Sequence, residues 1–213
     1  LDLQTNFKVH NYDTNKLTSF LINDFDWNFK DFNFKSGLKG KFLANVRNIN
    51  YEAKNIDIYK RDTTNELYGA LGYLTQLNLE KTSNDKKQKL KPKVLFRYSP
   101  NNNMRKEDTG STLSPINAFN INRLDSTNNY ETGFSTTLGL DYEILKNSKE
   151  FDFSIAQVIN EKENKKMPSK TSLDEKLSDL VVSSNYKLND KFQLSYNSAI
   201  DQNYKDINYS DIG

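Results

Sequence analysis

The residues of this sequence that could do chemistry are mainly carboxylates. Acidic side chains stand side by side at Glu107 and Asp108, and two residues apart at Asp141 and Glu143. Paired carboxylates work as general acid and base only when burial or a neighbouring charge shifts one of their pKa values. The chain offers little for that purpose, because it has no cysteine and a single histidine, His10. We therefore interpret the acidic pairs as solvated charges.

Other catalytic and metal-binding patterns are also missing from the sequence. It has no GxSxG nucleophile motif, no glycine-rich phosphate loop and no HExxH metal motif. Without cysteine the chain can form neither a disulfide nor a thiolate metal site, and one histidine cannot form a cluster. The sequence thus predicts a protein that is not an enzyme, with no catalytic residues, no metal and no cofactor.

The charge balance argues against nucleic acid as a partner. The chain carries 30 Lys and Arg residues against 28 Asp and Glu residues, a net charge of +2. A nucleic-acid-binding protein would carry a concentrated basic stripe. We interpret the one short basic run, residues 86–89, as a solvated turn.

Hydropathy excludes a transmembrane helix but not a membrane protein. Mean hydropathy is strongly negative, and no apolar run approaches the roughly 18 residues that a spanning helix needs. A barrel strand needs only about 9–11 residues of alternating character, half of them polar. The 13 Phe and 12 Tyr residues suit strands and bilayer interfaces.

Alternating apolar and polar residues are the dominant pattern of the sequence. In GFSTTLGLDYEI, residues 133–144, one set is almost wholly apolar and the other is small, hydroxylated or acidic. Successive side chains of a strand point to opposite faces, so this stretch predicts a two-faced strand. The apolar set is Phe134, Leu138, Leu140, Tyr142 and Ile144, which would meet the core of a soluble sandwich or the lipid around an outer-membrane barrel. The polar set includes Ser135, Thr137, Asp141 and Glu143, which would face bulk water in the first case and a wet lumen in the second.

The alternation changes parity at two places in the first quarter of the chain. Phe25, Trp27 and Phe29 share one parity, and the next two phenylalanines take the opposite one. We expect a tight turn or a bulge near Lys30 and Asp31, because one extra residue moves every later side chain to the other face. A second slip lies between residues 46 and 49.

Connections of unequal length separate the expected strands. Short ones, such as residues 146–149 and 188–190, are typical of hairpin turns. Long ones occupy residues 99–129 and 161–174. Expected strands at 130–145 and 175–188 are longer than most soluble strands, and the best helical candidate, residues 172–178, is very short. Long strands with short turns at one end and long loops at the other are typical of an outer-membrane barrel.

Apolar residues near the end of the first long connection predict that it folds inward. Ile116, Phe119, Ile121 and Leu124 have little reason to stand in a fully solvated loop. We expect them to pack against the barrel wall and to hold Asn122, Arg123 and Asp125 at the lumen. There Arg123 would pair with Asp125, Glu131 or a partner's carboxylate, or meet a substrate phosphate.

These patterns predict an all-β protein, an antiparallel transmembrane β-barrel segment that is incomplete and part of a large outer-membrane barrel. The chain begins without Met and ends directly after a strand-like stretch. We therefore expect residues 1–213 to be a single fragment of one barrel domain. A soluble all-β module that binds a partner through its long loops is the alternative fold.

The second half carries an ordered series of motifs. They read LKPKVLFRYSP from residue 90, FNINRLDSTNNYETGFSTTLGLDYEI from residue 119, FDFSIAQVIN from residue 151, and KLSDLVVSSNYKLNDKFQLSYNSAIDQ from residue 176. In this order they resemble the carboxy-terminal barrel region of the LptD family, the lipopolysaccharide-assembly proteins also called organic solvent tolerance proteins. The positions that match family motifs are Arg97 and Tyr98, then Asn122, Arg123, Asp125, Glu131 and Gly133, then Gln157, and finally Ser178 and Asp179.

The sequence departs from the family pattern at two glycines. The family's Ser-Gly-x-Asp spacing after the Asn-Arg pair is replaced by residues 124–126, and the glycine before Gln157 is Ala156. The resemblance covers residues 90–201 well and residues 1–80 only as generic barrel strands.

The resemblance implies a function in the outer membrane of a Gram-negative bacterium. It implies a very large barrel with a periplasmic domain before it and a plug lipoprotein inside it, acting as the translocon that inserts lipopolysaccharide into the outer leaflet. Its partners would be lipopolysaccharide, outer-membrane lipid, the plug lipoprotein and the periplasmic bridge components of the transport system. Another barrel, a porin or a nutrient receptor, shares the strand arguments and differs only in lacking the ordered motifs.

Overall fold

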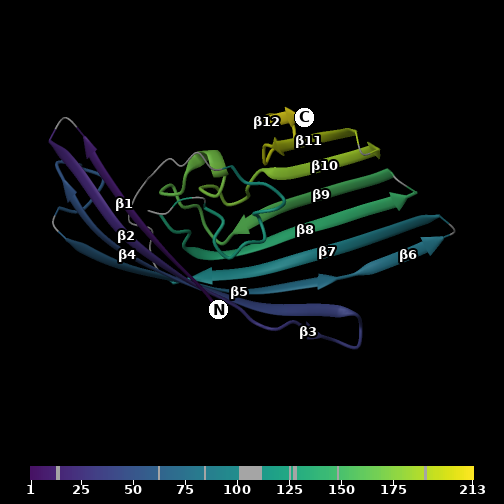
Figure 1. Ribbon diagram of the computed structural model, residues 1–213, viewed down its shortest axis with the longest axis horizontal. Helices are drawn as coiled ribbons and strands as arrows, with labels where there is room; N and C mark the ends of the chain where they lie inside the picture. Colours follow the sequence, from purple (N-terminus) through teal and green to yellow (C-terminus); the bar gives the residue numbers. More distant parts are fainter. Residues whose placement is uncertain are drawn as a thin grey trace.

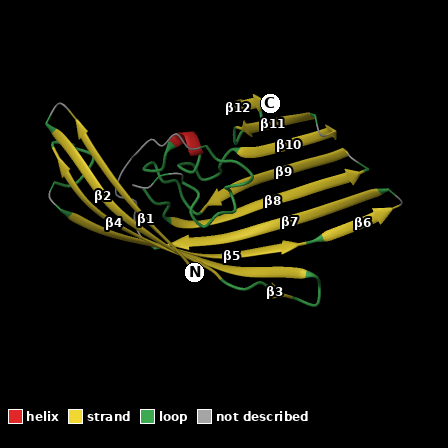
Figure 2. Cartoon of the chain, viewed as in Figure 1, coloured by secondary structure: helices red, strands yellow, loops and turns green. Residues whose placement is uncertain are grey.

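The chain forms one open antiparallel sheet. The computed structural model describes residues 1–12, 15–61, 63–83, 85–100, 112–124, 126, 129–147, 149–189 and 191–213. Within these residues there are twelve strands in one sheet and one short 3₁₀ helix, η1 (Ser169–Thr171), so the all-β antiparallel prediction is confirmed (Figure 2). The strands are β1 (Asp2–Tyr12), β2 (Lys16–Asn28), β3 (Phe32–Asn33), β4 (Leu38–Lys54), β5 (Thr64–Leu77), β6 (Leu79–Ser83), β7 (Lys86–Ser99), β8 (Gly133–Lys146), β9 (Lys149–Asn160), β10 (Leu180–Asn189), β11 (Phe192–Ile200) and β12 (Ile207–Ile212).

Neighbouring strands follow the order of the chain, as in an up-and-down barrel wall. The sheet order is β1-β2-β4-β5-β7-β8-β9-β10-β11-β12, with β3 paired to β4 and β6 paired to β7. The sheet does not close, because β1 and β12 are its two edges (Figure 1). It therefore has the topology of an incomplete barrel.

The connections differ at the two ends of the sheet. At one end, to the right in Figure 1, the strands are joined by short connections. The described residues of these connections are 34–37, 85, 147 and 191. At the other end the described residues of the connections are 15, 55–61, 63, 100, 112–124, 126, 129–132, 161–179 and 201–206. We call these the short-turn end and the long-loop end.

The expected irregularity at Lys30 and Asp31 is a bulge. Asn28 of β2 pairs with Leu43 of β4, and Phe32 of β3 pairs with Gly40. Residues 29–31 therefore lie opposite residues 41–42, one residue more on the first strand than on its partner. The extra residue explains why the phenylalanine pattern changes parity there.

The second parity slip has a different cause. β4 keeps one register with β5 from Leu38 to Tyr51, so there is no bulge between residues 46 and 49. Phe42 is exposed on one face, whereas Ile49 and Tyr51 are buried on the other. They pack with Phe20 and other side chains in a small apolar cluster. The apolar residues change face while the strand continues unbroken.

The distribution of side chains over the two faces is inverted relative to a soluble protein. One face, here called the outer face, carries exposed large apolar side chains, with Leu71 66% exposed. Its exposed apolar residues include Leu3, Phe7, Val9, Leu21, Trp27, Phe42, Leu67, Leu71, Phe96, Tyr98, Phe134, Leu138, Ile159, Leu194 and Tyr196. The opposite, inner face carries buried polar residues, among them Thr18, Asp24, Asn45, Arg47, Glu66, Arg97, Ser99, Ser135 and Thr137.

Two chain segments cover the inner face. The inner segment consists of residues 112–124, 126 and 129–131, and the second segment of residues 161–179; both lie in the hollow of the curved sheet (Figure 1). Phe119 and Leu124 are buried in the main apolar cluster and Ile121 packs against it, as predicted. Ile116 is 82% exposed, so its predicted docking is wrong.

Two local predictions are corrected by the strand boundaries. The strand expected from residue 175 begins at Leu180, because the preceding residues belong to the second segment and pair with β9 irregularly, through an isolated bridge from Leu177 and separate hydrogen bonds. The basic run at residues 86–89 is the start of β7 and not a turn. Lys89 lies directly opposite Glu143 of β8 and pairs with it, which gives this charge a place within the sheet.

Candidate functional site

The centre of the inner face is a buried cluster of two arginines and one glutamate. Arg97 comes from β7, while Arg123 and Glu131 come from the inner segment. The Arg123 guanidinium binds Glu131 in a two-pronged contact, with Nε donating to Oε2 at 2.8 Å and Nη2 to Oε1. Arg97 Nη1 lies 3.6 Å from Glu131 Oε1, and all three side chains are almost fully buried. Arginine suits this position because its planar fork matches a carboxylate.

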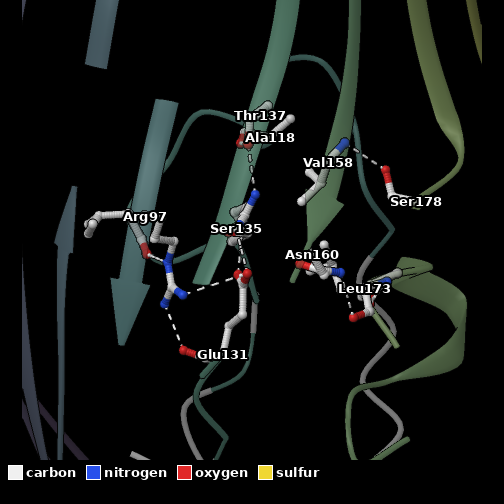
Figure 3. Close-up of polar contacts among 12 residues, drawn as sticks. Arg97, Ala118, Glu131, Ser135, Thr137, Val158, Asn160, Leu173 and Ser178 are labelled. Atoms are coloured by element: carbon white, nitrogen blue, oxygen red, sulfur yellow. Dashed lines mark hydrogen bonds and ion pairs between the residues drawn. The ribbon is translucent and has the colours of Figure 1, made fainter. Parts of the chain in front are cut away.

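The cluster joins the inner segment to two strands of the sheet, and Figure 3 shows Glu131 between Arg97 of β7 and Ser135 of β8. Arg123 Nη1 donates to Thr137 Oγ1 at 2.9 Å and Nη2 to Ser135 Oγ at 2.6 Å, both on β8. Arg97 Nε donates to the Ile121 carbonyl at 2.6 Å, and Nη2 to the Glu131 carbonyl at 2.7 Å. The small hydroxylated residues of the polar set in β8 therefore serve as acceptors for a buried arginine.

The electrostatics of the cluster keep Glu131 ionised. Burial by itself raises the pKa of Glu131, but the charges of Arg123 and Arg97 and the hydrogen bonds from Arg123 outweigh it. The net result is a pKa below the ordinary value of a glutamate. A carboxylate held in this way has no proton to give at neutral pH, so its role is to neutralise the two arginines.

A third buried arginine anchors the other side of the inner segment. Arg47 of β4 donates to both carboxylate oxygens of Asp24 on β2, at 2.6 and 2.9 Å. Its Nη1 donates to the carbonyls of Ser126 at 2.5 Å and Asn129 at 3.2 Å. The ion pair thus belongs to the sheet, and its spare donor holds the inner segment.

Tyr130 lies between the two anchors. Its ring stacks on Tyr68 of β5, and the Arg47 and Arg97 guanidinium carbons lie 5.8 and 5.7 Å from its centroid. Its hydroxyl donates to Asn45 Oδ1 at 2.6 Å. Burial raises the pKa of Tyr130 to about 12. The neutral phenol and its hydrogen bond are therefore favoured across the physiological range.

Asn122, the described neighbour of Arg123 in the Asn-Arg motif, has no hydrogen bond to the ion cluster through its Oδ1 atom. Asn122 precedes Arg123, and its Oδ1 atom is buried without a hydrogen-bond partner. Asp125 lies outside the described residues. Of the partners expected for Arg123, the structure brings Glu131 to it.

Gln157, Ser178 and Asp179 lie together on neighbouring elements, apart from the ion cluster. Ser178 Oγ accepts a hydrogen bond from the Val158 amide at 2.9 Å (Figure 3). The Ser178 carbonyl accepts one from Gln157 Nε2 at 2.9 Å. These bonds continue the pairing of β9 beyond the start of β10. The register puts Gln157 opposite Leu138 on the outer face, which does not agree with the lumen position considered for it.

Asp179 is the one charged member of this second group. Its carboxylate accepts Asn208 Nδ2 at 3.1 and 3.0 Å. Burial raises its pKa, the Asn208 hydrogen bond opposes that rise, and Asp201 and Asp174 add to it. Asp179 therefore ties the start of β10 to β12.

The sequence reasoning missed Asp24, Arg47 and Tyr130. The signal that could have found the ion pair is an acidic and a basic residue at matching positions of adjacent predicted strands. Asp24 lies opposite Arg47 in the β2–β4 register, so the pair needed only the strand pairing. Tyr130 carried no comparable signal, because it precedes β8 and belongs to the inner segment.

Two further kinds of feature, a metal-binding cluster and a membrane-spanning helix, are absent from the described residues. No three or more His, Cys, Asp or Glu side chains among them are arranged to hold a metal ion. In that same part of the chain no helix has the length and apolar character to cross a membrane. The polar groups at the centre of the inner face are engaged mainly with one another and with backbone carbonyls, an arrangement that holds chain segments in place.

Comparison with known proteins identifies the family. A family model described as LptD, LPS transport system D, matches residues 11–213, a wider range than the ordered motifs of the second half. A comparison with curated proteins found no match. The matched region includes the ion cluster, its anchors and strands β2 to β12 in full. The chain therefore belongs to the LptD family of lipopolysaccharide-transport components of the Gram-negative outer membrane.

Proposed function

We propose that residues 1–213 form part of the wall of an outer-membrane barrel that inserts lipopolysaccharide into the outer leaflet without breaking a bond. The observation that carries this proposal is the inverted distribution of side chains, with apolar residues exposed on the outer face and charges buried on the inner face. Lipid would contact the outer face, and the inner face would border a polar lumen.

A soluble all-β module explains the outer face poorly. Soluble monomers rarely expose contiguous apolar patches of more than a few hundred Å², because water penalises them. Here exposed apolar side chains recur on strands from β1 to β11. Phe42, Tyr73 and Phe96 form one continuous row across β4, β5 and β7. A hydrocarbon environment removes the penalty for such a surface.

The difference between the two ends supports an orientation. Barrels of the bacterial outer membrane have short periplasmic turns and longer extracellular loops. We assign the short-turn end to the periplasm and the long-loop end, with the inner segment, to the outside. Lipopolysaccharide would then approach from the short-turn end.

The inner face near the short-turn end has the chemistry expected for a path for sugars and phosphates. Lys89 pairs with Glu143 at 2.6 Å, and Lys93 pairs with Asp141 at 2.8 Å. Ser154 donates a further hydrogen bond to Asp141 at 3.0 Å. Half-buried pairs of this kind exchange hydrogen bonds with hydroxyl groups without leaving a naked charge.

In this proposal the two parts of the substrate move through different environments, one polar and one apolar. The sugar part stays in the polar lumen, while the acyl chains move sideways into the membrane through a weakened seam between the first and last strands of the whole barrel. The partners we propose are lipopolysaccharide, outer-membrane lipid, the plug lipoprotein and the periplasmic bridge components.

The candidate residues have structural roles in this proposal. Arg97, Arg123 and Glu131 hold the inner segment against the wall, and Gln157 and Ser178 join β9 to the start of β10. We do not assign direct substrate contact to any of them, because the arginines already have protein acceptors.

Depletion of the full-length protein tests the function. We expect lipopolysaccharide to disappear from the surface of intact cells, measured by antibody labelling, while the protein itself fractionates with outer membranes. Unchanged surface labelling after depletion would indicate a porin or nutrient receptor. Recovery in the soluble fraction would indicate a soluble module.

A further inference from the structure

Two hollows adjoin at the long-loop end of the outer face. One is an apolar groove of about 350 Å³ across β4, β5 and β7, and the other is a polar pocket of about 700 Å³ where β7 ends and β8 begins. Tyr98 and Phe134 line both hollows, so the groove continues into the pocket. Figure 3 shows three other residues of the pocket lining, Glu131, Asn160 and Leu173.

The groove offers a surface for hydrocarbon. Leu43, Gly72 and Arg97 contribute only backbone to its floor, because their side-chain positions lie on the inner face. Its walls are exposed or half-buried apolar side chains of the outer face, namely Phe29, Phe42, Leu71, Tyr73, Phe96, Tyr98 and Phe134. Since contact with hydrocarbon keeps such a surface from water, acyl chains suit this groove.

The polar pocket carries two cationic side chains that the protein leaves unpaired. Lys162, Lys165 and Lys166 all line it. Lys165 pairs with Glu175 at 2.7 Å and with Glu163 at 3.4 Å. Among the described residues, Lys162 and Lys166 have no ion-pair partner. Their ammonium groups are therefore available to a phosphate, for which lysine is a common ligand in proteins.

The pocket also holds acceptors for hydroxyl groups. Ser99 is 1% exposed and lines the pocket, and its Oγ atom has no hydrogen-bond partner within the described part of the chain. A buried hydroxyl without a partner costs free energy that a hydroxyl of a ligand would recover. The exposed carboxylate of Glu161 is a further acceptor in the same pocket. The pocket thus combines groups that bind phosphate with groups that bind sugar hydroxyls.

The outer face changes from apolar to polar side chains at the same end of the sheet. On β9 the exposed Ile159 is followed at the next outer position by Glu161, whose amide still pairs with β8. On β4 Val46 is followed by Asn48 and Asn50, and Asn50 Nδ2 donates to Asn48 Oδ1 at 2.5 Å. Amide and carboxylate groups are costly in hydrocarbon, so this change marks the boundary between acyl chains and headgroups.

We propose that the groove and the pocket together bind one molecule of a phosphorylated glycolipid, lipopolysaccharide of the outer leaflet, on the lipid side of the wall. The proposal rests on the proposed function, through the assignment of the long-loop end to the outside. Acyl chains fill the groove, phosphates bind Lys162 and Lys166, and sugar hydroxyls donate to Ser99 and Glu161. A phospholipid fits less well, because a single phosphate and a small headgroup leave one lysine and much of the pocket without a partner.

The test crosslinks lipid to the full-length protein in vesicles. A photoreactive benzoylphenylalanine replaces Phe134, which lines both hollows. The vesicles contain phosphatidylethanolamine with an equal molar amount of either lipopolysaccharide or phosphatidylglycerol as the anionic lipid, and adducts are identified by mass spectrometry. Replacement of Leu67 is the control, because Leu67 is 59% exposed on the outer face and lines neither hollow. We expect lipopolysaccharide to crosslink at position 134 about fivefold more than phosphatidylglycerol, with the two within about twofold at position 67.

A charge variant separates the pocket from general contact with lipid. Lys162→Gln with Lys166→Gln removes the two unpaired charges and leaves the groove intact. Lys35→Gln with Lys191→Gln removes the same charge at the short-turn end. All four lysines are exposed, so both variants should fold. We expect lipopolysaccharide crosslinking at position 134 to fall about fivefold or more in the first variant and to stay within about twofold in the second.

Equal crosslinking of the two lipids at position 134 would overturn the site. Crosslinking that the substitutions at Lys162 and Lys166 leave unchanged would overturn it as well. Loss of lipid crosslinking at positions 134 and 67 together would refute the lipid-facing wall, and the site with it. Surface lipopolysaccharide after depletion is scored separately, so failure of the proposed transport function is told apart from failure of the site.

Discussion

Replacing Leu138 with arginine distinguishes lipid from water at the outer face. Leu138 lies near the middle of β8, is 46% exposed, and has Val94 and Gln157 as its cross-strand neighbours. In water, an exposed leucine tolerates arginine with a change in stability of about 0.5 kcal/mol or less. In a bilayer, arginine on the lipid face near the midplane costs about 2–4 kcal/mol. The two environments therefore predict effects that do not overlap.

The expected loss is large enough to measure in one titration. A cost of 2–4 kcal/mol corresponds to a folding equilibrium constant lowered by a factor of about 30 to 1,000. The assay is reversible urea unfolding of the full-length protein in lipid vesicles, followed by tryptophan fluorescence and by heat-modifiability on gels. Leu138→Met is the control for lost packing, since its volume and apolar character are nearly kept.

The matched charge control is Asn185→Arg on the inner face. Asn185 of β10 lies opposite Asp152, which in turn lies opposite Glu143, so the new guanidinium meets acidic neighbours. We expect a change of less than about 1 kcal/mol for this variant. Equal losses for Leu138→Arg and Asn185→Arg, or no loss for Leu138→Arg, would refute the assignment of the faces.

Three further predictions concern the inner segment. Glu131→Gln leaves two buried arginines without their counter-charge, so we expect a loss of about 3–5 kcal/mol, read as faster hydrogen exchange across the segment; the exposed Glu163→Gln is its control. The pKa of Glu131 is lower in the folded protein than in the unfolded chain, so its contribution is complete above about pH 4.3 and is lost as the pH falls below that value. We therefore expect the hydrogen-exchange protection of the segment to be equal at pH 7 and pH 5 and to fall below pH 4. A fall in protection already between pH 7 and pH 5 would contradict this expectation. Tyr130→Phe removes the hydrogen bond to Asn45, so we expect the free energy of unfolding in urea to fall by about 1–3 kcal/mol below pH 10, where the phenol is neutral. An unchanged unfolding midpoint would contradict the role of this bond.

The two-faced strands were predictable because alternation is a local property of the sequence. The period of two in residues 133–144 already separates Phe134 and Leu138 from Ser135 and Thr137, and the register confirms that separation. The parity of the apolar residues alone could not distinguish a bulge from an unbroken strand whose apolar residues change from one face of the sheet to the other. At residues 29–31 the slip is a bulge, whereas Ile49 and Tyr51 turn inward to an apolar cluster that distant residues create.

The candidate site was predictable only in part, because its contacts depend on tertiary packing. Arg123 and Glu131 are close in sequence, and their pairing was among the expected outcomes. The anchor at Arg47 depends on a carbonyl of residue 126, far along the chain, which no local pattern encodes. The burial of Ile116 was predicted wrongly from its apolar side chain, because an apolar residue in a docked segment can still point to solvent.

Solvent accessibility of positions on the two faces of the sheet tests the barrel-wall assignment. Spin labels are attached in separate variants of the full-length protein in vesicles, at Leu67→Cys and Leu71→Cys on the outer face and at Gln76→Cys and Asn185→Cys on the inner face. We expect the outer pair to collide mainly with oxygen, which dissolves in lipid, and the inner pair mainly with a water-soluble nickel chelate. If the outer positions collide mainly with the nickel chelate, the outer face lies in water and the barrel-wall assignment is contradicted.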